Sequence, residues 1–226
     1  MTTLRLYAHE LREAYAAGQR DFRHWDLAQA DLRGLSIPGA SLYGADLSEA
    51  DLRDSDLTDV DLRAADLRRA QLEGAILAGA RLAYAQLAEA NLSYADLAGA
   101  DLEGAWLAGA NLADANLESA ILADSDLQRA NLEEADLAGA DLRDASLFES
   151  DLAGADLEGA DLSGADLSCA DLEQADLRDA TLVSAALRRA DLRCADFGGA
   201  DLTDVYLRGA NLHDADLAGT CLERNR

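Results

Sequence analysis

A large apolar residue recurs at every fifth position of the chain, from Phe22 to Leu222, without a single interruption. This makes 41 consecutive five-residue units. Two residues before each large residue stands a small one, almost always Ala, and between them stands mostly Asp or Asn, as in Ala45-Asp46-Leu47. A fixed internal period is the mark of a repeat architecture, so the fold must follow from it.

The period of five fits extended segments joined by corners. In extended backbone, side chains two residues apart point to the same side, so Ala and Leu face one way and the Asp between them faces the other. A helix does not fit, because a step of five residues turns by about 500° and would scatter the leucines over every face. The pattern therefore predicts an all-β solenoid of short parallel strands with apolar residues inside and polar residues outside.

The consensus Ala-Asp/Asn-Leu-x-x, which covers about nine-tenths of the chain, resembles that of the pentapeptide-repeat family. The resemblance implies a right-handed quadrilateral parallel β-helix with four units per coil and about ten coils. Glycine at the last residue of a unit supports the number four, because it concentrates in one column with a period of twenty residues. We expect these corners to have positive φ, which glycine tolerates. The column holds Gly39, Gly79, Gly99, Gly139, Gly159, Gly199 and Gly219.

The first twenty residues follow a different pattern. Their apolar residues lie at helical spacing, namely Leu4, Tyr7, Leu11 and Tyr15. Thr3 can cap the start of a helix and Gly18 can end it at the C′ position. The pattern predicts an amphipathic helix over residues 4–17.

We expect residues 1–20 to form a helix that caps a single β-helix over residues 21–226. An open solenoid end exposes strand edges and core side chains, so a cap is the favoured role; the alternative is a separate partner-binding helix. Trp25 and Leu35 replace the small residue in the first coil, as though extra volume were filled beneath a cap.

The chain is strongly acidic, with 44 acidic against 19 basic residues, all of them Arg, and a net charge of −25. With four units per coil, the outward Asp, Glu and Arg sum to −6 on face one, which contains Leu42, and −2 on face two, which contains Leu47. They sum to −9 on face three, which contains Leu52, and −10 on face four, which contains Leu57. The predicted partner-binding acids are stacked on faces three and four: Asp136, Asp151, Asp156, Asp171, Asp176, Asp191, Asp196 and Asp216.

Face two offers an alternative partner surface, because it is nearly neutral and carries aromatic and Arg side chains. Residues of these types are enriched at interaction hot spots. The candidates are Trp106, Phe148, Arg188, Arg189 and Tyr206. Single exposed aromatic residues are also ordinary on protein surfaces, so an inert face two is the competing interpretation.

The sequence contains no pattern typical of catalysis or of metal or cofactor binding. Cys and His residues are few and scattered: Cys169, Cys194, Cys221, His9, His24 and His213. None of them has zinc-site spacing, and a convex rod with a filled interior offers no desolvated cleft for paired carboxylates. We therefore expect no enzyme activity. An odd number of Cys residues without a signal segment or an apolar span predicts a cytoplasmic protein that binds no membrane.

Three functions remain open. B-DNA carries one charge per ~1.7 Å, and 25 net charges over a rod of roughly 48 Å come close to that density. The resemblance to family members without inserted loops that protect type II topoisomerases from poisons then implies a DNA mimic that binds DNA gyrase. The alternatives are a scaffolding rod with a protein partner on face two, and an acidity that serves only solubility. Direct nucleic-acid binding is disfavoured, because phosphate contacts need a basic surface.

The last coil predicts an oligomer. Its inward leucines would lie open to water at the end of the rod, and exposed strand edges invite pairing with another chain. We expect a homodimer that joins two such ends across a two-fold axis. The residues of this dimer end are Leu207, Leu212, Leu217 and Leu222.

Overall fold

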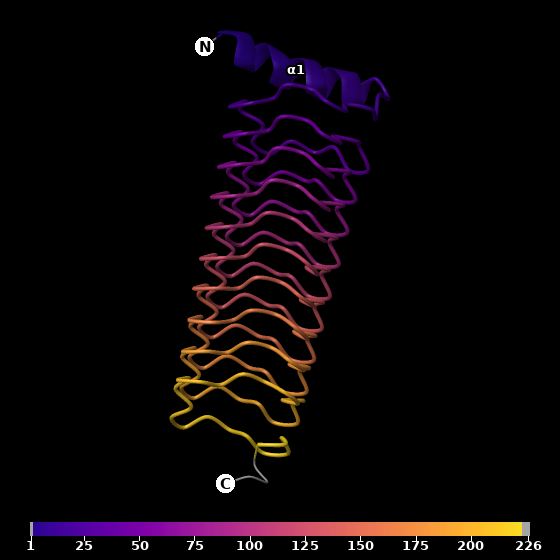
Figure 1. Cartoon of the computed structure of the whole chain (residues 1–226). Helices are drawn as coiled ribbons and strands as arrows, with labels where there is room; N and C mark the ends of the chain where they lie inside the picture. Colours follow the sequence, from indigo (N-terminus) through magenta and orange to yellow (C-terminus); the bar gives the residue numbers. More distant parts are fainter. Residues whose placement is uncertain (1, 223–226) are drawn as a thin grey trace.

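The computed structural model describes residues 2–222, with side chains from residue 9 onward, as a straight rod with a helix lying across one end (Figure 1). Helix α1 spans Thr2–Ala16, close to the predicted 4–17. The helix ends as expected, since the amides of Gly18 and Gln19 donate to the carbonyls of Tyr15 and Ala14 at 2.9 and 3.0 Å. The expected contributions of Leu4, Tyr7 and the Thr3 cap lie outside the described side chains. No helix within residues 2–222 has the length and apolar character that a membrane crossing needs.

The rod is a parallel solenoid in which one residue of each five-residue unit forms a bridge with the residue twenty positions later. The bridges run in unbroken register from Asp21–Ser41 to Asp196–Asp216, so four five-residue units make one turn. Each bridge is a single residue long, because the chain leaves the extended conformation two residues later to turn a corner. The described part of the chain therefore has sides held by isolated parallel bridges instead of longer strands.

The backbone hydrogen bonds follow the same register. The amide of Leu27 donates to the carbonyl of Asp46 at 2.7 Å, and the amide of Asp46 donates to the carbonyl of Trp25 at 2.9 Å. Within a unit, the amide of Ala30 donates to Leu27 at 3.0 Å and closes the corner. Repeated in every coil, these bonds satisfy the polar backbone groups that the buried interior could not leave unpaired.

Positive φ is a property of every corner. The glycines of the predicted column have it, from 63° at Gly99 to 79° at Gly219. The corners of the other three columns have it too, including Tyr84 at 59° and Arg69 at 58°. The expectation that glycine marks the left-handed corners was therefore too narrow, because side chains occupy the same conformation where the cross-coil hydrogen bonds impose it. Nothing in the backbone angles explains why glycine favours one column.

The interior is a continuous column of leucine and alanine along the rod. Every large residue of the repeat from Phe22 to Leu202 is at most 2% exposed, as the pattern predicts. Leu11 of α1 belongs to the same core and is fully buried. The Tyr15 hydroxyl donates to the carbonyl of Pro38 at 2.9 Å, so contacts from both ends of a helical turn hold α1 over the first coil.

The first coil differs from the others beneath α1. Leu35 is 2% exposed, and Trp25 is half-buried with its ring edge-on to Phe22 at a centroid distance of 5.1 Å. Leu35 belongs to the same core cluster as Leu11 of α1, and Trp25 packs against that cluster.

Candidate partner-binding surfaces

The aspartates of the repeat have a structural role before any functional one. Their Oδ1 atoms accept the amide of the residue two positions later, as Asp136 does from Ala138 at 3.0 Å and Asp156 from Glu158 at 2.9 Å. Such Asx turns stabilise the start of each corner. Much of the acidity thus follows from turn chemistry, and Asn serves equally well, as Asn116 does for Glu118.

Arginine two positions after such an aspartate forms a fork onto the same carboxylate. Arg63 binds Asp61 through Nε and Nη2 at 2.8 and 2.9 Å. These hydrogen bonds hold the pKa of Asp61 below its usual value although the residue is buried. The equivalent bonds from Arg23 lower the pKa of Asp21 to about 2. These carboxylates stay ionised in the pairs, so each pair adds no net charge to the surface.

The predicted acids of face four form one row along the rod. Successive members are bridged to each other, so they lie one coil apart. We call this set the face-four acid row: Asp136, Asp156, Asp176, Asp196 and Asp216. Small residues border it, including Ala138, Gly139, Gly159, Gly198, Gly199 and Ala218. Large side chains border the row only in its middle, at Glu158, Arg178 and Asp179.

Two of the predicted partner-binding acids of faces three and four are neutralised by arginines. Arg193 binds Asp191 at 2.8 Å, and Arg178 binds Asp176 at 2.6 Å. Both arginines also reach back twenty residues, Arg193 to Glu173 at 2.6 Å and Arg178 to Glu158 at 2.5 Å. Asp151 and Asp171 continue the face-three column through successive bridges.

One cluster within the row brings together enough carboxylates for a cation. Single oxygens of Asp156, Glu158 and Asp176 lie within 4.8 Å of one another. Arg178 donates to two of these three residues, so a guanidinium of the chain itself already balances their charge. The cluster is therefore a salt-bridge network, and we assign it no metal.

The candidate residues of face two lie at different heights along the rod. Trp106 and Tyr206 are 60% and 51% exposed, but they lie 100 residues apart in the same column. Arg188 lies over the Tyr206 ring, with its guanidinium carbon 5.2 Å from the centroid. Phe148 is half-buried, two coils before Arg188 in its column. The structure thus groups three of the five alternative candidates, Arg188, Arg189 and Tyr206, towards the C-terminal end, whereas Phe148 lies two coils from Arg188 and two coils from Trp106.

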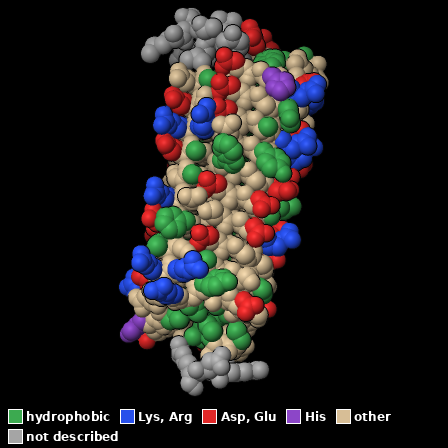
Figure 2. All heavy atoms as spheres, in the orientation of Figure 1, with side chains coloured by type: hydrophobic (Ala, Val, Ile, Leu, Met, Phe, Trp, Pro, Cys, Tyr) green, Lys and Arg blue, Asp and Glu red, His purple; other side chains and the backbone are tan. Residues whose placement is uncertain are grey.

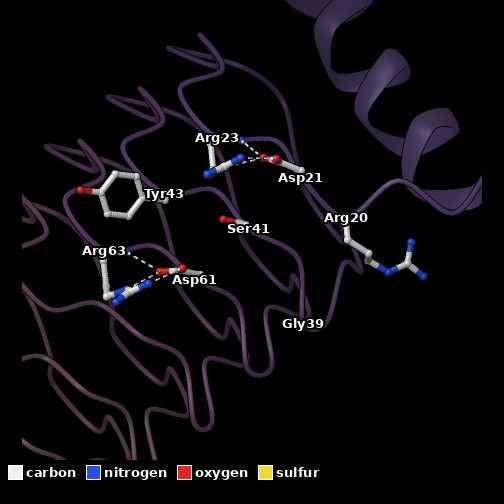
Figure 3. A pocket seen from close by; sticks show the side chains of 8 residues that line it. All are labelled: Arg20, Asp21, Arg23, Gly39, Ser41, Tyr43, Asp61 and Arg63. Atoms are coloured by element: carbon white, nitrogen blue, oxygen red, sulfur yellow. Dashed lines mark hydrogen bonds and ion pairs between the residues drawn. The ribbon is translucent and has the colours of Figure 1, made fainter.

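A hollow of about 510 Å³ opens on face one near α1, which sequence reasoning missed (Figure 3). Tyr43 lies between the Arg23–Asp21 and Arg63–Asp61 pairs, and Arg20 points away from them (Figure 3). The lining residues are Arg20, Asp21, Arg23, Gly39, Ser41, Tyr43, Asp61 and Arg63. Its ionised carboxylates are paired within the chain, so it offers no poised acid or base. The feature of the sequence that could have indicated this hollow is Ser41, which stands between Asp21 and Asp61 in a column of mostly aspartates.

The predicted dimer end has looser packing than the rest of the core. Leu207, Leu212 and Leu222 are half-buried, and Leu217 is 6% exposed. Their counterparts in the preceding coils are almost fully buried. An apolar surface therefore reaches solvent in the last described coil.

The chain was then compared with known proteins. The family model of pentapeptide repeats matches in eight copies that together span residues 21–224. The matched segments are 21–54, 55–93, 85–124, 95–133, 125–164, 155–193 and 190–224. The chain belongs to the pentapeptide-repeat family, whose fold is a right-handed β-helix. Members of this family are typically structural or interaction proteins.

Two solved structures are similar over most of the chain. HetL from the cyanobacterium Nostoc sp. strain PCC 7120, a protein involved in the regulation of heterocyst differentiation, is 37% identical; the match covers 94% of this chain and 95% of HetL, with a TM-score of 0.66. QnrB1, a plasmid-mediated fluoroquinolone resistance protein, is 18% identical; the match covers 80% of this chain and 92% of QnrB1, with a TM-score of 0.65. At that identity, the likeness to QnrB1 concerns the fold. No curated protein matches the chain significantly.

Proposed function

We propose that the protein is a non-enzymatic DNA mimic that binds a type II topoisomerase, DNA gyrase first among them, through the face-four acid row and protects it from inhibitors. The observation that carries the proposal is the row itself: five aspartates in unbroken register, one per coil, bordered mostly by small residues. Coils of a parallel sheet lie ~4.8 Å apart, so the carboxylates form a regular line of charge. The partner surface would be the basic saddle that normally holds DNA, and the place of action the cytoplasm.

Electrostatics supports this choice of partner. A net charge of −25 repels nucleic acid and attracts basic protein surfaces, and such fields raise association rates. Arg178 neutralises Asp176, yet the other four members of the row have no ion pair within the described residues. The row therefore presents charge that a basic surface can meet directly.

A supercoiling assay with purified gyrase tests the proposal. The wild-type protein is expected to inhibit supercoiling or to reduce the DNA cleavage that a fluoroquinolone induces. Replacing all five aspartates of the row by Asn is expected to raise the concentration needed about tenfold or more, because charge complementarity is lost. Asn keeps the Oδ1 acceptor of the corner, as Asn116 shows in the same column, so the variant should fold.

A matched control removes the same charge elsewhere. It replaces five aspartates of face two by Asn: Asp26, Asp46, Asp66, Asp126 and Asp166. Each set contains one Arg-paired member, Asp176 in the row and Asp66 in the control. Equal loss in both variants would show that only the total charge matters. No wild-type effect at micromolar protein would refute the proposal.

We also propose that the protein forms a homodimer through the half-buried leucines of the last described coil. Leu212→Arg is expected to convert a dimer into a monomer, because it places a charge within the apolar contact. Light scattering at tens of micromolar protein in moderate salt measures the mass. The control is Asn211→Arg at the neighbouring exposed position. A wild-type mass near the chain's own 23.9 kDa would contradict the dimer.

A regulatory scaffold is the second candidate function. It is favoured by the likeness to HetL, which extends over 94% of this chain. A scaffold would use face two, where Arg188, Arg189 and Tyr206 gather and Phe148 and Trp106 lie farther along the same face. Trp106→Ala should leave gyrase inhibition unchanged if the acid row carries the function. If Trp106→Ala abolishes a partner interaction and the Asn substitutions of the acid row have no effect, the scaffold on face two is favoured.

A further inference from the structure

The arginines of this chain follow a pairing rule that two of them break. Eight arginines stand two residues after an aspartate and form a fork onto it: Arg23, Arg33, Arg53, Arg63, Arg68, Arg143, Arg178 and Arg193. Arg188 and Arg208 occupy the same position of the unit, but Ala186 and Tyr206 stand where the aspartate should be. The repeat therefore places two guanidinium groups where their carboxylates are missing.

A third arginine beside them breaks a second rule. Arg69 and Arg129 stand at the corner position and bind the glutamate one coil later, Glu89 at 2.9 Å and Glu149 at 2.7 Å. Arg189 stands at the same corner position, but Gly209 follows it one coil later. Every other arginine whose side chain the structure describes has a carboxylate or carbonyl partner, including Arg12, Arg20 and Arg81.

The three exceptions form one surface, which we call the Arg patch: Arg188, Arg189 and Arg208. All three are exposed, and within residues 9–222 none has an acidic group within ion-pair distance. Arg188 and Arg208 stand in one column, one coil or ~4.8 Å apart, and Arg189 is adjacent. Tyr206 makes a cation–π contact with Arg188, whose guanidinium carbon lies 5.2 Å from the centroid of the ring. Figure 2 shows blue side chains gathering near the C-terminal end of the visible face.

We infer that the Arg patch binds a short acidic segment of a partner protein, whose carboxylates take the positions of the missing aspartates. The chain itself demonstrates the geometry, because on the same backbone an arginine two residues after an aspartate binds its carboxylate eight times, as Arg68 binds Asp66. A long polyanion would extend onto the acidic neighbouring faces, whereas charges beyond about 10 Å are screened from a short segment. The inference does not rest on the topoisomerase proposal, since it uses a different face.

Fluorescence anisotropy with a labelled hexaglutamate peptide at low salt tests the inference on the full chain. The triple variant Arg188→Gln, Arg189→Gln, Arg208→Gln is expected to weaken binding about tenfold or more. The control variant Arg68→Gln, Arg69→Gln, Arg129→Gln removes three arginines from the same face that have acid partners, and it should bind within about twofold of wild type. Because the patch makes no structural ion pair, the melting temperature of the triple variant should not fall.

A chemical footprint gives an independent readout. Cys169 precedes Arg189 by one coil, and its amide donates to the carbonyl of Arg188 at 2.8 Å. Cys194 is equally exposed, but it lies on face three. The peptide should slow alkylation of Cys169 and leave that of Cys194 unchanged, as followed by mass spectrometry.

Several outcomes would overturn the inference. These are equal binding of hexaglutamine, equal loss in both arginine variants, protection of both cysteines or of neither, and tighter binding of a six-nucleotide DNA strand. A change in the mass of the protein in the triple variant would assign the patch to a second copy of this chain instead. The triple arginine variant keeps the face-four acid row, so it should still inhibit gyrase if the topoisomerase proposal is right. The two proposals can therefore fail independently.

Discussion

Leu132→Asp is expected to abolish the cooperative folding of the central coils. Leu132 is fully buried in the middle of the rod. Removing a buried leucine side chain costs about 2–5 kcal/mol, and an unpaired buried carboxylate adds several more. This approaches the whole stability of a typical domain, about 5–15 kcal/mol. Circular dichroism during heating should show a loss of β signal at 25 °C or a melting temperature lowered by tens of degrees.

The neighbouring residue supplies the control for this experiment. Asn131→Asp introduces the same charge one position earlier, where the side chain faces outward and its Oδ1 accepts the amide of Glu133 at 3.0 Å. Aspartate makes the same bond at Asp151 in the next coil, so the control should melt like wild type. An unchanged melting temperature for Leu132→Asp would contradict the inward assignment of the repeat leucines.

Leu11→Asp is expected to detach α1 and leave the β-helix folded. Leu11 is the fully buried contact of the helix with the core, and in a solenoid each element is stabilised by its neighbours. An isolated helix of 15 residues is marginal in water, so its helical signal should disappear. The first coil would then expose apolar side chains and unpaired strand edges, which promote self-association.

Two measurements check this result. The helical part of the circular dichroism spectrum should fall while the β signal remains, and light scattering should show assemblies larger than wild type. Ala16→Asp adds the same charge at an exposed position of α1 and should change neither. If Leu11→Asp keeps the wild-type mass, α1 does not protect the end of the rod, and a separate partner-binding role becomes the better interpretation.

Most of the fold was readable from the sequence, because the period carries the information locally. The pattern within each unit predicts which residue faces inward, and the burial of the large repeat residues from Phe22 to Leu202 confirms this prediction. The helix near the start was also readable, since Leu11 and Tyr15 lie on one face. The glycine column pointed to a twenty-residue turn, which the bridges show. Its glycines have positive φ as expected, but all corners share this property, so it does not explain why glycine favours one column.

The candidate surfaces were less predictable, because counting charges along a face does not show which side chains form ion pairs with each other. The predicted set of partner-binding acids on faces three and four treats Asp176 and Asp191 as available charges, yet Arg178 and Arg193 hold both. Arg178 also spans a coil to Glu158, a contact between residues twenty positions apart that depends on the side-chain conformation. The alternative surface on face two included Trp106, which the rod places far from Tyr206.

The sequence by itself determined the class of fold, the inward and outward residues and the acidic surface, because a strict five-residue period leaves one way to bury Leu and Ala together. Only the tertiary structure decided which charges are paired and which are exposed. Stacking in register sets each side chain beside the residue twenty positions away, and pairing there depends on side-chain length and direction. Arg189 has no carboxylate partner because Gly209 lies one coil later, whereas Arg129 pairs with Glu149 at the equivalent position.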